Sequence, residues 1–394
     1  MDLLAVSRAP AIYHVPIYRE LHRHLGDRFR AIFASPGFAE TYHHPAWGGE
    51  LSLEGDLLEG YGCEVLGTNG AMTARHPVGR ASAVASLVRR IEALRPGAVL
   101  VTGDRDPFSR AAIFTTRTLG GRALLRSSPF DQRTRSTVAG LVRDAALRIS
   151  YASIDAFAAV GTRARLHYEH YSGRPADVFS SPYCTDEGVL RPHVEHHSDL
   201  RAELRQGLGI EQDAFVFLFC GRLAPVKRVP WVLRALDRYL ATGADAHLLV
   251  VGTGPEKDLV DGAAARHPGR VHVLGAQNRA GVARAMAASD TLLLPSESET
   301  WGVVVNEAFL FGLPVVASDA VSAAVDMIVE GETGFTFPAS DFEAFAALLP
   351  RVVDRVRAGL DARVLAAITE RFSARAAATG ILRAARLDGS IKGA

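Results

Sequence analysis

The sequence predicts an α/β fold made of two Rossmann-like, doubly wound domains. Short β-branched runs alternate with helical stretches along the chain, a pattern typical of parallel sheets covered by helices. The chain has 394 residues, and a single hydrophobic core stops growing at roughly 250–300 residues, so two domains are expected. We expect the first domain at 1–190 and the second at 191–372, followed by a helix at 373–394 that packs back on the first domain.

In the first half, the segment 36–60 is expected to be a loop, because it contains two pairs of turn-forming residues, Pro-Gly and Gly-Gly. Strands are expected near 2–6, 30–34, 62–67, 98–102, 122–126 and 156–160, and helices near 13–25, 81–94, 107–119, 133–150 and 162–171.

The second half begins after a polar, turn-rich stretch at 181–199. Strands are expected at 214–220, 246–251, 271–274, 291–295 and 314–318, and helices at 228–241, 256–266, 279–288, 302–312, 341–357 and 361–369. Open α/β sheets bind ligands beyond the carboxyl ends of their strands. We therefore expect the chemistry in the loops that follow the strands, in a cleft between the two domains.

Composition excludes several classes of protein. The net charge of +1 gives no general attraction to nucleic acid or anionic lipid. No apolar run approaches the roughly 18 residues that span a bilayer, and the N-terminus has no secretory signal, so we expect a cytoplasmic protein without a strong membrane signal. Cys63, Cys184 and Cys220 form no CxxC pair, which argues against a disulfide framework and a zinc site. The sequence predicts no oligomeric state.

The stretch FCGRLAPVKR, 219–228, places two cations after an apolar strand. Gly221 makes the turn, and Arg222 and Lys227 project from the loop or the first helical turn. Only three of the 44 basic residues are lysines, so a lysine in this position is notable. An arginine that grips phosphate oxygens and a compact lysine charge suit a diphosphate. The alternative is a solvated pair of charges near a helix start.

The stretch VVGTGPEKD, 250–258, resembles a dinucleotide fingerprint but is not GxGxxG, because Lys257 occupies the third glycine position. As a sign of NAD binding it is weak, and no acid follows the next strand as an oxidoreductase would require. Gly254 fits a turn that lets the backbone approach a ligand, or a purely structural turn.

The most informative stretch is LLLPSESETWGVVVNEAFLFGLPVVASD, 292–319, in which Glu299 lies before a predicted apolar helix and Glu307 inside it. A carboxylate among apolar side chains is costly unless it is satisfied, and sugar or ribose hydroxyls would satisfy both. Amides near Trp301 and Gly302, at the helix start, would receive a phosphate or sugar oxygen. The alternative is a helix-terminal acid and a surface acid.

Together, GRL-x3-K, VGTGP, E-x7-E, GLPVVAS and EGETGFTFP resemble the GT4-like, retaining GT-B glycosyltransferases over nearly all of 212–345. The first domain resembles one branch more loosely, through 13–21, 48–61 and 161–186. The resemblance implies metal-independent transfer of a sugar from a nucleotide diphosphate sugar, with UDP- or GDP-sugars favoured, to a hydroxyl acceptor, without a further cofactor.

The resemblance also implies roles for individual residues. Arg222, Lys227, Glu299 and His14 are the candidate catalytic residues, with Glu299 positioning the sugar while the leaving phosphate takes the acceptor proton. The donor contacts carried over are Gly221, Arg222, Lys227, Gly254, Leu274, Gln277, Glu299, Thr300, Trp301, Gly302 and Glu307. In the first domain, Asp104 and Arg105 follow a predicted strand, as His14 does, and all three also fit as caps or loop residues.

One segment departs from the family. Many relatives carry a histidine or glutamate after the strand at 122–126, where this chain has Arg126, Ser127 and Ser128. Either Arg126 contacts the donor, or the acceptor geometry differs. The arginines of 122–148 are interleaved with aspartates and read as a solvated helix face, or as a weak lipid or acidic-substrate contact. The histidines at 43–44 and 192–199 read as loop residues.

Alternative functions remain open at this point. The alternatives are a GT-B-fold phosphorylase or nucleotide-sugar epimerase, and a catalytically silent relative that binds a nucleotide sugar. The acceptor is open between a small molecule, a glycan and a lipid-linked sugar, because the first-domain loops carry little recognisable signal. The lack of a strong basic or amphipathic patch favours a soluble acceptor.

Overall fold

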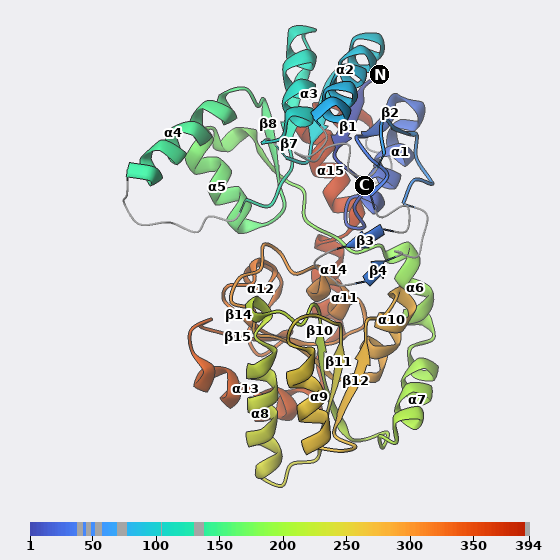
Figure 1. The fold of residues 1–394 in the computed structure, drawn as a ribbon, viewed down its shortest axis with the longest axis vertical. Coiled ribbons are helices and arrows are strands. Elements are labelled where there is room, and N and C mark those ends of the chain that lie inside the picture. Colours follow the sequence, from blue (N-terminus) through green and yellow to red (C-terminus); the bar gives the residue numbers. More distant parts are fainter. Residues whose placement is uncertain are drawn as a thin grey trace. The chain divides into compact units, whose positions relative to one another are not determined.

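The computed structural model describes residues 1–37, 42–44, 49–51, 57–68, 77–103, 105–129 and 138–390. The chain divides into two compact units (Figure 1). The first unit comprises Met1–Tyr42, Gly55–Asp186 and Phe372–Ala394, and the second comprises His43–Glu54 and Glu187–Arg371. Each unit has its own parallel sheet.

The first unit is built on a seven-stranded parallel sheet of order β5-β2-β1-β6-β7-β8-β9. The strands are β1 (Leu3–Ser7), β2 (Phe29–Phe33), β5 (Cys63–Val65), β6 (Ala98–Val101), β7 (Arg122–Leu125), β8 (Ala156–Ala159) and β9 (Val178–Ser180). Its helices are α1 (Val15–Leu25), α2 (Pro77–Leu94), α3 (Pro107–Thr118), α4 (Val138–Ala152), α5 (Thr162–Ser172) and α15 (Ala374–Ala384), with short 3-10 helices at Gly26–Arg28, Pro175–Asp177 and Asp388–Ser390.

Helix α15 closes this unit from the far end of the chain. It contacts α1, β8 and β9. Gly380 meets the backbone of Ser180 so closely that a Cβ would collide with its carbonyl oxygen. The absence of a side chain at Gly380 therefore lets α15 lie directly against β9.

The second unit has a six-stranded parallel sheet of order β12-β11-β10-β13-β14-β15. The strands are β10 (Phe215–Cys220), β11 (Ala246–Val251), β12 (Val271–Gly275), β13 (Thr291–Leu294), β14 (Val315–Ser318) and β15 (Gly334–Phe337). The helices are α6 (Glu187–Glu195), α7 (His197–Leu208), α8 (Val229–Ala241), α9 (Lys257–Arg266), α10 (Arg279–Ala288), α11 (Val303–Leu310), α12 (Ser322–Met327), α13 (Phe342–Arg357) and α14 (Ala362–Arg371), with a 3-10 helix η4 at Pro225–Lys227.

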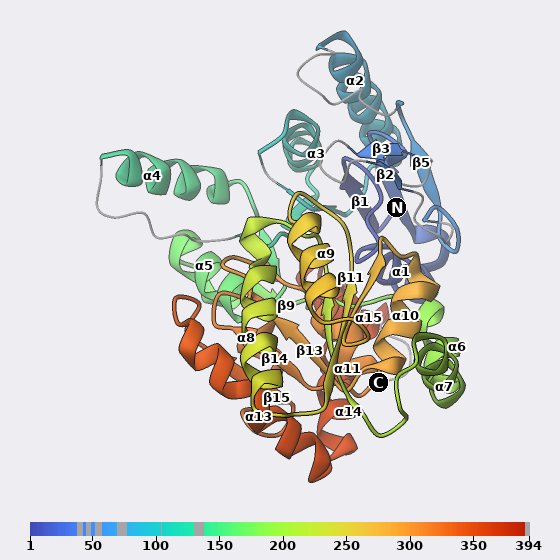
Figure 2. The same cartoon turned by 60° about the horizontal axis from the view of Figure 1, so that its bottom comes forward.

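Alternation along β10 builds the core of the second unit. Phe215, Phe217 and Phe219 point to one face, where they pack with apolar residues of α8, α9 and α13. Figure 2 shows α8 and α9 crossing in front of this sheet. The strand order reverses at β10, which has β11 on one side and β13 on the other. A doubly wound sheet binds its ligands at such a switch point, beyond the carboxyl ends of the strands.

The α/β class and the two doubly wound sheets are confirmed, and every predicted strand is present. The prediction of a loop over 36–60 was wrong in part, because β3 (Tyr42–His44) pairs with β4 (Gly49–Leu51). These strands are too short for the alternation of apolar and polar residues to reveal them.

The turn-rich interpretation of 181–199 was also wrong, since α6 and α7 occupy most of it. The loop interpretation of the histidines at 43–44 and 192–199 was wrong for all but His196, which lies between α6 and α7. These two helices bury few side chains, so their sequence lacks an apolar stripe. Strands β9 and β15 and helix α12 were likewise not predicted.

Candidate active site

The switch point of the second sheet brings together two residues that the motifs singled out. Lys227 ends the 3-10 helix η4 in the loop after β10, and Glu299 lies in the loop after β13. The Lys227 ammonium forms an ion pair with Glu299 Oε2, and the two side chains are only 21% and 18% exposed. The pair therefore connects the two loops that border the expected ligand position.

Burial sets the ionisation of this corner. It lowers the pKa of Lys227 to about 8. Burial also raises the pKa of the neighbouring Cys220 thiol, which is kept protonated and acts as a small apolar side chain. Of these two groups, Lys227 is therefore the one whose charge changes near neutral pH.

Three polar atoms around the carboxyl ends of β10, β11 and β13 are buried without a hydrogen-bond partner. They are Arg222 Nε, Glu256 Oε2 and Ser296 Oγ. Buried polar groups are nearly always paired in folded proteins, so a cluster of unpaired ones at a switch point indicates a place where a polar ligand completes the hydrogen bonds. Burial also raises the pKa of Glu256.

Two glycines press the loop after β11 against the loop after β10. Gly252 and Gly254 have φ of +136° and +153°, and a Cβ at either would collide with the carbonyl oxygen of Gly221 or Leu223. Hydrogen bonds join the same loops, from the amide of Leu223 to the oxygen of Thr253 at 2.9 Å. Because glycine has no side chain, Gly252 and Gly254 can pack against the loop that carries Arg222 and hold its backbone in place.

Helix α11 begins beside Glu299 with free capacity for an anion. Its N-cap is Gly302, with φ of +97°, so no side chain caps the amides of the first turn. The preceding Trp301 is buried, and its indole Nε1 donates to Asn306 Oδ1 at 2.8 Å. The loop is thereby anchored to the helix while the amide end stays uncapped.

Glu307 lies on the same helix and is half-buried. It forms no salt bridge among the described residues. Burial raises its pKa to about 7, an effect that the charge of Arg279 opposes. Burying a carboxylate costs less free energy when it accepts hydrogen bonds from hydroxyl groups than when it has no partner.

The remaining candidates of the second unit lie at the same edge of the sheet. Gln277 is exposed, and its amide donates to the carbonyl oxygen of Leu274 at 2.5 Å. Asn278 caps α10 by accepting from the amide of Gly281 at 2.8 Å. Thr300 is exposed in the loop before α11. The predicted residues of the second unit thus lie in the loops after β10, β11, β12 and β13, at the end of β12 and on α11.

His14 belongs to the first unit, at the N-cap of α1, where its side chain makes no capping hydrogen bond. It is 8% exposed, and burial, followed by the charge of Arg126, lowers its pKa well below the ordinary range. The imidazole is therefore neutral. Arg105 is exposed, and Asp104 lies outside the described residues.

One expectation for the first unit needs correction, the interpretation of Arg126 as part of a solvated helix face. Arg126 is 1% exposed at the end of β7, so it does not belong to a solvated helix face. The residue that caps α3 is Asp106, whose carboxylate accepts from the amides of Phe108 and Ser109. An Asp directly before a proline that begins a helix is a recognisable cap signal.

Sequence reasoning missed Ser296, Glu256 and Arg279 as site residues. Ser296 and Glu256 stand inside the two quoted motifs, directly after Pro295 and Pro255, so their position after a strand was a usable signal. Arg279 begins α10 and reaches Glu307 only through the fold, and no local pattern announces that.

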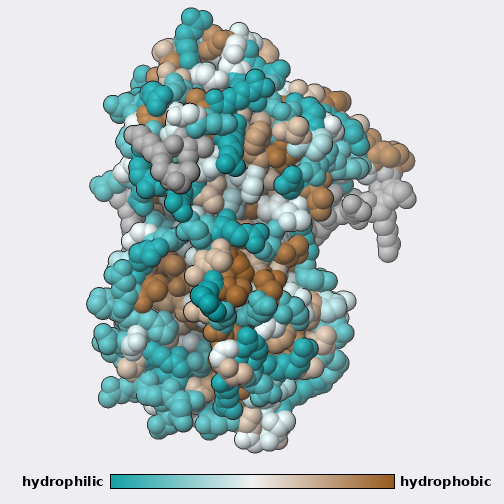
Figure 3. All heavy atoms as spheres, turned by 180° about the vertical axis from the view of Figure 1, so that it is seen from behind, coloured by the Kyte–Doolittle hydropathy of each residue, from teal (hydrophilic) through white to brown (hydrophobic). Residues whose placement is uncertain are grey.

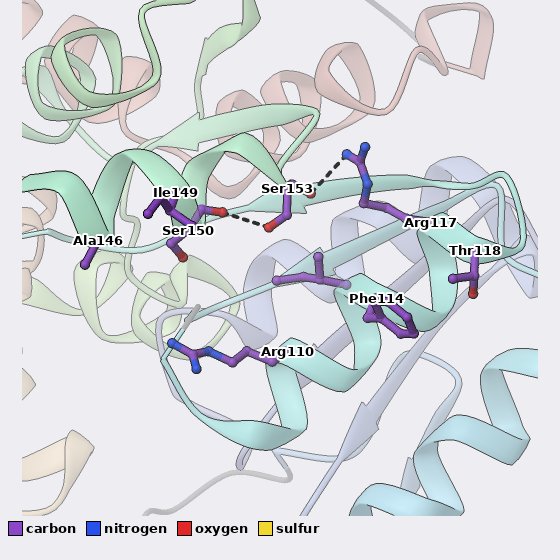
Figure 4. A pocket seen from close by; sticks show the side chains of 9 residues that line it. Arg110, Phe114, Arg117, Thr118, Ala146, Ile149, Ser150 and Ser153 are labelled. Carbon is purple, nitrogen blue, oxygen red and sulfur yellow. Dashed lines mark hydrogen bonds between the residues drawn. The ribbon is translucent and has the colours of Figure 1, made fainter.

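A separate cavity of about 670 Å³ lies between α3 and α4 in the first unit. Ile113, Phe114 and Ile149 line it with Arg110 and Arg117 (Figure 4). Exposed apolar side chains continue along α4, which projects at the right edge of the first unit in Figure 3. None of the residues predicted for the site lies in this cavity.

Among the described residues, no group of three or more His, Cys, Asp or Glu side chains is arranged to hold a metal ion. Within the same part of the chain, every helix is too short or too polar to cross a bilayer.

Two doubly wound units of this topology define the GT-B fold, and solved structures agree with it. Anabaena Alr3699/HepE in complex with UDP superimposes with a TM-score of 0.71 at 18% identity, over 97% of this chain and 99% of that one. The same protein in complex with UDP-glucose gives a TM-score of 0.63 at 18% identity, over 99% and 98%.

Residues 201–356 match the family described as Glycosyl transferases group 1. A phosphatidyl-myo-inositol mannosyltransferase of Mycolicibacterium smegmatis is 33% identical over 159 residues, 39% of this chain and 41% of the relative. A D-inositol 3-phosphate glycosyltransferase of Nocardioides sp. is 32% identical over 213 residues, 48% of this chain and 45% of the relative. The chain spans less than half the length of these curated relatives.

Proposed function

We propose that the protein is a retaining, metal-independent glycosyltransferase that moves a sugar from a nucleotide diphosphate sugar to a hydroxyl acceptor. The observation that carries the proposal is the Lys227–Glu299 pair at the switch point of the second sheet, next to the unpaired Arg222 Nε. The family match over 201–356 supports the same reaction class. A UDP-sugar is the favoured donor, because the superimposed Anabaena protein binds UDP and UDP-glucose.

In this proposal the second unit holds the donor. Arg222, Lys227 and the uncapped amides of α11 bind the diphosphate, and Glu307 accepts from the ribose hydroxyls. Glu299 and the backbone of 300–302 hold the sugar, and Leu274 and Gln277 lie where the base binds. Gly221 and Gly254 allow the close approach of backbone that this arrangement needs.

Chemistry follows from the charge that develops at the leaving group. When the sugar–phosphate bond breaks, negative charge grows on the β-phosphate oxygen. Fixed cations and amides stabilise this charge more in the transition state than in the ground state. The acceptor hydroxyl attacks the same face of an oxocarbenium-like sugar, and its proton passes to the leaving phosphate. Glu299 then positions the sugar, and the side chains present do the work that a metal ion does elsewhere.

Thermal unfolding with nucleotides tests the donor assignment. The purified protein is heated with UDP, GDP, ADP and dTDP and their common sugar conjugates, with and without EDTA. A ligand at about 100 times its Kd adds roughly 2.7 kcal/mol to stability. We expect UDP or GDP to raise the Tm regardless of EDTA, and Lys227→Ala and Glu307→Ala to abolish the effect.

Lys257→Ala is the matched control, because Lys257 is an exposed lysine paired with Asp261 on α9. If no nucleotide shifts the Tm of the wild type, the donor assignment is wrong. If a nucleotide sugar binds but no acceptor is glycosylated and no nucleotide is released, the protein is a silent relative. The anomeric configuration of a product, read by NMR, decides between retention and inversion.

A further inference from the structure

Among the described residues, two arginine side chains are fully buried, Arg126 in the first unit and Arg205 in the second. Arg205 has all its donors satisfied. Its Nη2 lies 2.9 Å from Asp290 Oδ2, and its Nε and Nη1 donate to carbonyl oxygens of the surrounding backbone. An opposite charge and a full set of hydrogen bonds compensate for the cost of burying this charge.

Arg126 lacks both of these compensations. Its Nε donates to Ser181 Oγ at 3.0 Å and its Nη2 to the carbonyl oxygen of Pro182 at 2.9 Å. Its Nη1 is buried without a partner, and no salt bridge reaches it among the described residues. The guanidinium lies 4.9 Å from the ring centre of Tyr183. A cation–π contact compensates only a small part of the cost of burying a charge.

Among the described residues, the titratable groups with a pKa shifted by the charge of Arg126 are tyrosines and a histidine rather than acids. Tyr13, His14 and Tyr183 are close enough for its charge to act on them. The rings of Tyr13 and Tyr183 lie 4.9 Å apart, and that of His14 stacks on Tyr183. Asp186, a buried acid three residues after Tyr183 in the chain, is paired with Arg19 at 2.9 Å. Among the described residues, the cluster therefore has a positive charge and no anion paired with it.

The position of the cluster is that of a ligand site. Arg126 directly follows β7, and His14 follows β1, so both stand at the carboxyl edge of the first sheet. Ser127 and Ser128, which come next in the chain, are half-buried rather than buried. Partly exposed residues thus begin one position after Arg126, whose Nη1 has no partner.

We propose that Arg126 binds an oxyanion, a phosphate or a carboxylate, that belongs to the acceptor substrate. The free Nη1 donates to the anion, and the uncharged rings of Tyr13, His14 and Tyr183 surround it. The assignment of the anion to the acceptor rests on the proposed glycosyl transfer. The anion site itself does not depend on that proposal. The acceptor is then an anionic molecule with a hydroxyl group, rather than a neutral glycan.

The first test measures anion binding with the donor site disabled. Inorganic phosphate and succinate are titrated by calorimetry at constant ionic strength into Lys227→Ala, and into the double variant Lys227→Ala/Arg126→Met. We expect one or both anions to bind Lys227→Ala and to bind the double variant at least tenfold more weakly. The stronger anion identifies a phosphate-bearing or a carboxylate-bearing acceptor. Equal binding to both variants, or no binding to either, overturns the proposal.

A second measurement covers the case in which Arg126→Met fails to fold. The imidazole signals of His14, assigned with His14→Gln, are followed by NMR while phosphate or succinate is added to Lys227→Ala. An anion beside Arg126 offsets its charge at His14, so the His14 signals should move together with the calorimetric saturation. Signals that stay fixed while the anion binds place the anion elsewhere and contradict the proposal.

The two proposals fail separately. Arg126→Met should leave the stabilisation by UDP or GDP unchanged, because these bind the second unit. If the variant weakens nucleotide binding, the anion at Arg126 is a donor phosphate and the acceptor assignment is wrong. If nucleotides do not bind the wild type but phosphate still depends on Arg126, the anion site stands and the donor assignment falls.

Discussion

Lys227 and Glu299 form their ion pair across the switch point of the second sheet, although 72 residues separate them in the sequence. The cation proposed to bind the diphosphate is thus held by the carboxylate proposed to bind the sugar. A nucleotide that takes Lys227 must compete with Glu299, and the sugar hydroxyls of a complete donor replace the lysine as partners of the carboxylate. The pair therefore favours a complete donor over a bare nucleotide.

This competition predicts opposite effects of Glu299→Gln on two ligands. The change removes the competing charge from Lys227, so UDP or GDP should bind about 3- to 10-fold more tightly, since a partly buried pair is worth about 1 kcal/mol. The same change should weaken the nucleotide sugar, because an amide binds sugar hydroxyls less strongly than a carboxylate. Calorimetry with both ligands gives the comparison.

Glu297→Gln is the control, because Glu297 is an exposed acid in the same loop. Since the pKa of Lys227 is about 8, nucleotide affinity in the wild type should also fall above that pH. A variant Glu299→Gln that weakens both ligands equally would show that the pair supports the loop and does not discriminate between them.

The sequence predicts those features of the site that depend on neighbouring residues, and it does not predict contacts between residues far apart in the chain. Arg222 and Lys227 stand directly after a recognisable strand, and parallel topology then places the loop at the ligand edge. The partner of Lys227 is set by the pairing of β10 with β13, which no local pattern reveals. Arg126 looked like a surface residue because its burial depends on Ser181 and Pro182, 55 and 56 residues away.

The half-buried Glu307 predicts a stability that depends on pH. Its pKa is about 7 in the folded protein against an ordinary value of 4.5, which corresponds to about 3 kcal/mol. Below pH 4.5 both states carry the proton, and the stability is fully present. As the pH rises through 7, the folded state must ionise a half-buried carboxylate, and this stability is lost.

Glu307→Gln removes that loss, so the variant should be more stable than the wild type at pH 8 and should not be more stable near pH 4.5. Urea unfolding at both pH values measures the difference. Glu203→Gln, at an exposed position on α7, should change nothing. A gain of the same size at both pH values would show that ionisation of Glu307 is not its cause.

Ser296 separates binding from stability. Its Oγ is buried without a partner, so Ser296→Ala removes no hydrogen bond from the free protein. We expect a free energy of unfolding within about 0.5 kcal/mol of the wild type and a nucleotide-sugar affinity lowered about 5- to 10-fold, the value of one hydrogen bond. Thermal unfolding with and without the donor measures both.

The matched control is Ser318→Ala, at a serine that is equally buried but donates to the carbonyl oxygen of Ser296. It should lower stability by about 1 kcal/mol in the free protein, because it leaves that oxygen without its donor. If Ser296→Ala also destabilises the free protein and leaves donor affinity intact, Ser296 has a packing role only.

Gly252 tests whether the contact between the loops after β10 and β11 is required. A Cβ at this position would collide with the carbonyl oxygen of Gly221, and φ is +136°, so Gly252→Ala must displace the loop that carries Arg222. We expect a loss of at least about 2 kcal/mol of stability from strain and overpacking, with loss of nucleotide binding.

Gly243→Ala is the control, since Gly243 has φ of +84° but nothing within 4 Å of its Cβ position. This substitution should lower the free energy of unfolding by only about 1 kcal/mol. Urea unfolding compares the two variants, and equal costs would mean that the backbone angle matters and the contact with Gly221 does not.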